Sequence, residues 1–110
     1  MIESIISMEL PAGGHLAIRR NRICPEQETK QCRRISLVSG IHGDELEGQY
    51  ICYETARRVK EHPEYLKGVV DIDPALNPLG IDMASRTVPR LEMDMNRMFP
   101  GDASGDMMEW

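Results

Sequence analysis

The fold is decided by one continuous segment, ISLVSGIHGDELEGQYICYETARRVK, which runs from Ile35 to Lys60. Its first five residues, 35–39, form a short apolar run before a glycine, which is typical of a buried strand. Residues 47–60 place apolar side chains three or four positions apart, which predicts a helix. The turn at 40–46 holds a histidine and two carboxylates between glycines. The segment therefore predicts a strand, a bend rich in ionisable groups, and a helix.

The predicted helix should bury one face and end at His62-Pro63, because proline cannot continue a helix. Its apolar stripe is imperfect, but the spacing stays close to the helical period. The residues that we assign to the apolar face are Tyr50, Ile51, Glu54, Ala56 and Val59.

A second short strand is predicted at 69–73, where glycine precedes an apolar run and proline follows it. A strand, about a dozen helical residues and another strand are typical of a βαβ unit, whose two strands are parallel. Two β-prone runs, at 2–8 and 15–19, are separated by turn residues and predict a hairpin. The sequence therefore predicts an α/β fold with a mixed, partly parallel sheet and flanking helices.

Two stretches are predicted to lack regular structure. Residues 24–34 are polar and include Pro25, and residues 74–106 are interrupted repeatedly by proline and glycine. A loop as long as the second one is usually functional when it lies in a compact domain.

The composition is that of one ordinary globular domain, which we assign to residues 1–110. The chain is 41% hydrophobic and 28% charged, values that argue against disorder. Its net charge is −5 and it has no basic block, so nucleic acid is not expected as a partner. No apolar stretch approaches the roughly 20 residues that a membrane span needs, so no membrane partner is expected.

The three cysteines, Cys24, Cys32 and Cys52, are odd in number and fit no zinc ribbon or redox pair. We expect reduced thiols in a cytoplasmic protein, with a Cys24–Cys32 disulfide as the alternative. The N-terminus carries Glu3 early and has no basic segment, so we do not expect a secretory signal.

The turn at 40–46 is the first candidate site. Zinc is bound by histidine nitrogen and carboxylate oxygen, and His42 and Glu45 stand three residues apart at the entry to the predicted helix. Ligands of open α/β sheets bind at the carboxyl ends of the strands, which is where this turn lies. The alternative is a solvated turn, because a histidine and a glutamate at this spacing often occur by chance.

The second candidate site lies in the long predicted loop. It includes Asn77-Pro78-Leu79-Gly80, Arg86 and the segment DMNRMFPG at 94–101. Arginine matches a carboxylate with two parallel hydrogen bonds, and asparagine adds an amide that can hold or orient such a group. These residues indicate capture of an acidic substrate. The alternative is that the arginines are surface charges in an acidic chain.

The order of these pieces resembles the succinylglutamate desuccinylase/aspartoacylase family, a branch of the zinc carboxypeptidase superfamily. The motifs that carry the resemblance are SGIHGDELEG, NPLG, Ser85-Arg86 and DMNRMFPG, which together span about residues 35 to 101. The resemblance implies the N-terminal part of a zinc-carboxypeptidase-like fold.

The resemblance also implies roles for particular residues. His42 and Glu45 match two zinc ligands, and Arg86 matches an arginine that polarises the scissile carbonyl and stabilises the oxyanion. Asn96 and Arg97 match a pair that binds the substrate carboxylate. Asp94 is expected to orient an arginine or a zinc ligand.

The implied reaction is zinc-dependent hydrolysis of a small N-acyl amino acid that keeps a free carboxylate. Two alternatives stay open: a peptide carboxypeptidase relative, and a non-enzymatic fragment or interaction module with weak metal binding.

The resemblance further implies a third zinc ligand, a histidine, and a glutamate that activates water, both well downstream of DMNR. His15 and His62 do not match that position, so we expect a truncated domain with little or no activity by itself. An unfinished parallel sheet would leave an exposed edge that invites association with another copy. A methionine-rich C-terminal segment offers a second surface for association, formed by Met93, Met95, Met98, Met107 and Met108.

Overall fold

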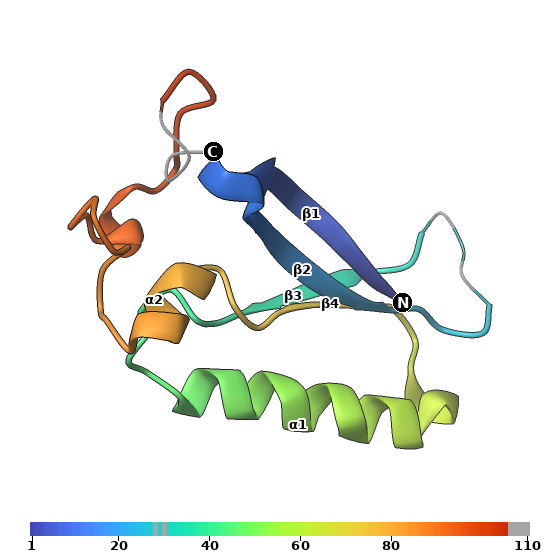
Figure 1. Ribbon diagram of the computed structural model, residues 1–110. Coiled ribbons are helices and arrows are strands. Elements are labelled where there is room, and N and C mark those ends of the chain that lie inside the picture. Colours follow the sequence, from blue (N-terminus) through green and yellow to red (C-terminus); the bar gives the residue numbers. More distant parts are fainter. Residues whose placement is uncertain (28, 30, 106–110) are drawn as a thin grey trace.

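The computed structural model describes residues 1–27, 29 and 31–105. Its centre is a four-stranded sheet with the strand order β1-β2-β4-β3. The strands are β1 (Ile2–Glu9), β2 (His15–Ile23), β3 (Arg34–Val38) and β4 (Val69–Asp73). The long helix α1 (Glu47–Glu61) runs along one face of this sheet (Figure 1).

The sheet is mixed, as predicted. The hairpin partners β1 and β2 are antiparallel, and β2 is also antiparallel to β4. The strands on either side of α1, β3 and β4, are parallel, with Leu37 opposite Ile72. The predicted α/β class and the predicted βαβ unit are therefore confirmed.

The core lies between α1 and the sheet. Four buried residues form its centre, and they come from three different elements: Ile23, Cys52, Ala56 and Ile72. The residues Cys52 and Ala56 are small, which lets the helix backbone approach the strands closely.

The predicted apolar face of α1 was partly wrong. Tyr50 and Ile51 are exposed, and the buried stripe consists of Cys52, Ala56 and the half-buried Val59 at i, i+4 and i+7. The face that meets the sheet is therefore the one with small side chains, because large tyrosines could not fit so close to the strands.

The strand β2 is longer than predicted and continues to Ile23. Two of its last four residues are arginines, and each of the last three residues opposes a residue of β4, with Arg22 opposite Asp71. Arg22 donates two hydrogen bonds to Asp71, at 2.7 and 2.9 Å, and Arg20 binds Asp73 in the same forked way. These charge pairs hold β2 to β4 in addition to the apolar core contacts of Ile23.

The prediction that residues 74–106 contain no regular element was wrong. The short helix α2 (Pro78–Met83) follows β4, and a single 3₁₀ turn spans Met95–Arg97. Asn77 caps α2 and Pro78 occupies its first turn, a common way for a helix to begin. The helix ends at Ala84, which has left-handed backbone angles.

The strand β3 forms one edge of the sheet, and its Ile35 and Val38 side chains are exposed. The sequence predicted an exposed edge beside the parallel pair, and β3 is such an edge strand. Association through this edge stays a prediction. Of the five methionines named above, Met107 and Met108 lie outside the described residues.

Two further sequence expectations can be compared with the structure. Cys32 is a free thiol whose sulfur accepts the backbone N–H of Thr29 at 3.3 Å, so it is not joined to Cys24. Among the described residues, no helix has both the length and the apolar composition needed to cross a bilayer.

Candidate functional site

The loop between β3 and α1 carries the first pair of predicted site residues. It lies at the carboxyl ends of the parallel strands β3 and β4, and α2 lies at the same end of the molecule (Figure 1). Open α/β sheets commonly place ligands there, because loops from neighbouring strands converge. His42 is 9% exposed, whereas Glu45 faces solvent.

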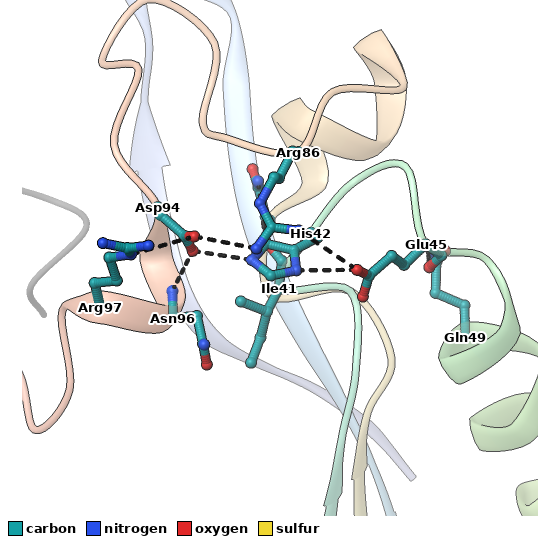
Figure 2. A network of polar contacts seen from close by, with 9 residues as sticks. Ile41, His42, Glu45, Gln49, Arg86, Asp94, Asn96 and Arg97 are labelled. Atoms are coloured by element: carbon teal, nitrogen blue, oxygen red, sulfur yellow. Dashed lines mark hydrogen bonds and ion pairs between the residues drawn. The ribbon is translucent and has the colours of Figure 1, made fainter.

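The imidazole of His42 lies between two carboxylates (Figure 2). Its Nε2 is 2.9 Å from Oδ1 of Asp94, and its Nδ1 is 3.3 Å from Oε1 of Glu45. An ionised carboxylate only accepts hydrogen bonds, so a ring that bonds both must donate from both nitrogens. The arrangement therefore favours the imidazolium form of His42.

The electrostatics agree with this arrangement. The hydrogen bond that the His42 ring donates to Asp94 is the main cause that raises the pKa of His42, while burial and the nearby Arg86 act in the opposite direction. The same hydrogen bond lowers the pKa of Asp94, helped by the backbone N–H of Asn96. Both shifts describe one charged pair that holds the ring in a fixed orientation.

Asp94 is the point where the two candidate sites meet. Its Oδ1 accepts the backbone N–H of Asn96 at 3.0 Å as well as the His42 ring. Its Oδ2 lies 3.4 Å from Nη2 of Arg86 and 3.8 Å from Nε of Arg97. One carboxylate therefore ties the DMNR segment to the histidine of the earlier loop (Figure 2).

Arg86 bridges the two carboxylates that flank His42. Its Nη1 lies 3.7 Å from Oε1 of Glu45, and its Nη2 lies near Asp94. Arg86 is thus paired within the cluster, although its side chain stays half exposed. The guanidinium can shift toward a ligand, because neither ion pair is short.

The two residues expected to bind a substrate carboxylate differ in placement. Asn96 lines a pocket of about 300 Å³ beside His42 and Glu45. Arg97 is 81% exposed and touches only the edge of the cluster through Asp94. The rest of the pocket wall comes from the end of β3, the loop that follows it and the first turn of α1. A pocket of this size can admit a small polar molecule.

His42 and Glu45 are suited to zinc by their chemistry, since both donor types are common zinc ligands. Their donor atoms, Nδ1 of His42 and Oε1 of Glu45, lie 3.3 Å apart, a separation that two ligands of one zinc ion can have. Within the part of the chain that the structure describes, no group of three or more His, Cys, Asp or Glu side chains could hold a metal ion. The described residues thus supply two donors at this position.

The sequence placed Asn77 in the second candidate site, but it did not predict the internal contacts that this residue makes. It is 1% exposed, and both ends of its side-chain amide are used inside the protein. Its Oδ1 accepts the N–H of Gly80 at 2.9 Å, and its Nδ2 donates to the carbonyl of Ile41 at 3.2 Å. The Asn-Pro pair at the start of α2 signals a helix cap, but nothing local signals the contact to Ile41.

The sequence and the fold of the chain can be compared with those of known proteins. Residues 31–109 match the family described as the succinylglutamate desuccinylase/aspartoacylase catalytic domain. This match covers well over half of the chain.

The chain belongs to this family.

Individual members of the family resemble the chain in sequence and in fold. The N-alpha-acetyl-L-2,4-diaminobutyric acid deacetylase of Halomonas elongata is 36% identical over 73 residues, which cover 66% of this chain and 21% of that protein. The structure of succinylglutamate desuccinylase/aspartoacylase from Rhodobacter sphaeroides is 31% identical, with a TM-score of 0.76, and the match covers 94% of this chain and 31% of that chain. The product-bound ectoine utilization protein EutE from Ruegeria pomeroyi is 28% identical with a TM-score of 0.75, at the same coverage.

These comparisons confirm the predicted family resemblance and the α/β class. The chain spans about a fifth of the length of the curated deacetylase and about a third of each solved family structure. The roles of individual site residues in this family member stay predictions.

Proposed function

We propose that this family member carries part of the active site of a zinc-dependent hydrolase that removes the acyl group from a small N-acyl amino acid. The observation that carries the proposal is the contact network around His42, which joins Glu45, Arg86 and Asp94 beside a pocket. The similarity to a deacetylase supports the choice of an N-acyl amino acid over a peptide.

In this proposal His42 and Glu45 hold the zinc ion. Asp94 accepts a hydrogen bond from the Nε2–H group, so Nδ1 is the ring atom that would bind metal in place of a proton. When bound, zinc would act as a Lewis acid toward the substrate carbonyl. The carboxylate of Asp94 would keep the ring oriented and make it a stronger ligand.

Arg86 would stabilise the negative charge that develops on the acyl oxygen during hydrolysis. Such preorganised charge is usually a large contribution to acyl transfer. The carboxylates of Glu45 and Asp94 hold the guanidinium beside His42, so it need not be brought in from solvent.

Asn96 and Arg97 would bind the free carboxylate of the substrate. Asn96 already lines the pocket, and among the described residues the exposed guanidinium of Arg97 has one long ion pair to give up. A bidentate contact from arginine would then select substrates with a carboxylate.

The proposal includes a further zinc ligand and a water-activating carboxylate that are supplied by residues other than those described, in the same protein or in another chain. Two ligands hold zinc more weakly than three. We therefore expect the 110-residue chain alone to show little or no hydrolysis. We also propose a cytoplasmic location.

Zinc titration of the chain, followed by competition with a chromophoric chelator, tests the proposed ligands. We expect weak binding that falls by at least about tenfold in His42→Ala and in Glu45→Gln. The control is His62→Ala, which removes an exposed histidine at the C-terminal end of α1 that contacts Glu64.

A panel of N-acetyl amino acids, with release of the free amine as the readout, tests the expected lack of turnover by the isolated chain. Equal zinc binding by the control and both ligand variants would reject the proposed metal site. Turnover by the isolated chain that persists after a chelator has removed its metal would reject the zinc-dependent mechanism.

A further inference from the structure

We infer that Asn77 is a positioning residue, which sets the backbone on the N-terminal side of His42 and thereby aims the imidazole ring. The inference concerns the shape of the loop before any metal binds. Its consequence for zinc affinity rests on the proposed function, whereas its consequence for the ring itself does not.

The side chain of Asn77 contacts the loop at the peptide group immediately before His42. Its Nδ2 donates to the carbonyl of Ile41, and that carbonyl belongs to the peptide unit whose nitrogen is that of His42. The backbone N–H of Asn77 donates to the carbonyl of Gly40 at 2.8 Å. Two consecutive peptide groups of the loop are thus held by one residue.

Asn77 is itself held firmly, so it can act as a fixed point. Its side-chain oxygen caps α2 through Gly80, and its backbone carbonyl accepts the N–H of Ile81 at 3.0 Å. Because the side chain is almost completely buried, its partners have no water to replace it if it is removed.

A second contact holds the loop on the other side of His42. The N–H of Gly43 donates to the carbonyl of Ser85 at 2.9 Å. A Cβ atom at Gly43 would lie 2.0 Å from the carbonyl carbon of Gly80, so the two backbones are in direct contact. The residues on either side of α2, Asn77 and Ser85, therefore hold the loop by hydrogen bonds before and after His42.

The loop needs this external support because it has little structure of its own. The backbone bond from the N–H of Glu45 to the carbonyl of His42 is long, at 3.4 Å. The ring must nevertheless place both nitrogens against carboxylates that come from different parts of the chain. Ligand geometry in functional sites must be held to within about half an ångström, which requires rigid supporting contacts.

The variant Asn77→Asp tests this role with almost no change in shape. The aspartate keeps the oxygen that caps α2, but it places a second acceptor where Ile41 needs a donor. We expect the ring ¹⁵N resonances of His42 to shift in the metal-free chain, and hydrogen exchange of the Gly43 amide to accelerate by at least about tenfold. We also expect the zinc affinity to fall by about tenfold.

The matched control is Val59→Ala on α1, which lowers the stability of the fold without touching the loop. A merely structural role for Asn77 predicts that both variants change stability and that neither shifts the His42 ring resonances. Unchanged ring resonances in a folded Asn77→Asp variant would overturn the inference.

A measurement on the unmodified chain covers the case in which Asn77→Asp does not fold. The side-chain amide protons of Asn77 should exchange with solvent at least about tenfold more slowly than those of the exposed Asn96. Equally fast exchange at both residues would overturn the inference. Absence of zinc binding by the unmodified chain would count against the proposed function only, because the ring resonances of His42 and the amide exchange rates are measured without metal.

Discussion

At the scale of single residues, His42 is the most constrained group in the site, because each of its ring nitrogens faces a carboxylate. Asp94 makes the shorter contact and is the main cause that raises the pKa of His42. Glu45 makes the longer one and is exposed. Asp94 should therefore control the protonation of the ring more strongly than Glu45 does.

We predict that Asp94→Asn lowers the pKa of His42 toward its ordinary value in the metal-free chain. A neutral amide no longer stabilises the imidazolium, so the ring loses its proton at a lower pH than in the unmodified chain. NMR titration of the His42 ring measures the change. Asp102→Asn is the control, since the Asp102 carboxylate accepts its hydrogen bonds from Ser104 in the same turn. An unchanged His42 titration in Asp94→Asn would contradict the prediction.

At the scale of elements, the central strand β4 supports both faces of the sheet. Its Ile72 is buried against α1, while Asp71 and Asp73 pair with the arginines of β2. Successive residues of a strand point to opposite faces, so one five-residue strand holds both the apolar core and the charged ladder. The neighbouring edge strand β3 contributes less to the core.

We expect Ile72→Ala to lower the free energy of unfolding by about 2–5 kcal/mol, because it leaves a cavity in the core. Ile35→Ala is a matched control on the neighbouring strand, and it should cost less than about 1 kcal/mol because Ile35 is 62% exposed. Urea denaturation followed by circular dichroism measures both values. Similar losses of unfolding free energy in the two variants would show that Ile72 is not more buried than Ile35.

The charged ladder predicts a loss of stability in acid. The Arg22 guanidinium beside Asp71 holds the pKa of that carboxyl below its usual range, so the folded state binds a proton less readily than the unfolded state. The resulting stability is fully present above the ordinary pKa of an aspartate and is lost as the pH falls toward the lowered pKa of the folded state. Urea denaturation at a series of pH values measures this loss.

Asp71→Asn is the comparison for the acid experiment, because it removes the titrating group while it keeps the shape. We expect this variant to be less stable at neutral pH, with a smaller further loss in acid. Parallel pH curves for the two proteins would mean that Asp71 does not control acid unfolding.

At the scale of the whole molecule, β3 is an edge strand of the sheet that the described residues form. Exposed strand edges readily pair with other chains, because their outward N–H and C=O groups lack partners within the sheet. The exposed Ile35 and Val38 add apolar surface to this edge. The edge lies next to the pocket, since Val38 lines one of its walls.

We predict that the isolated chain associates through β3 and that Val38→Lys weakens this association by at least about tenfold in dissociation constant, because a charge on the edge opposes strand pairing. Sedimentation velocity over a range of concentrations measures the assembly. Leu46→Lys is the control, because Leu46 is exposed at the start of α1 and not on the edge strand. Association that is unaffected by Val38→Lys would place the contact elsewhere.

Much of the fold and part of the site could be predicted from the sequence. The limits of α1 and β4 follow from local patterns, and so does the placement of His42 and Glu45 at the end of a strand. The helix at 78–83 was missed because proline and glycine were read as interruptions, although Pro78 in the first turn and Asn77 before it favour a helix start.

The sequence by itself determined α1, β4 and the parallel pair, because these depend on neighbours along the chain. Only the tertiary structure decided which face of α1 is buried, that Arg20 and Arg22 pair with β4, and that Asn77 supports the loop before His42. The bond between His42 and Asp94 joins residues 52 positions apart, and the bond between Ile41 and Asn77 spans 36. Such pairings are chosen by the packing of whole elements against one another, and no local pattern specifies them.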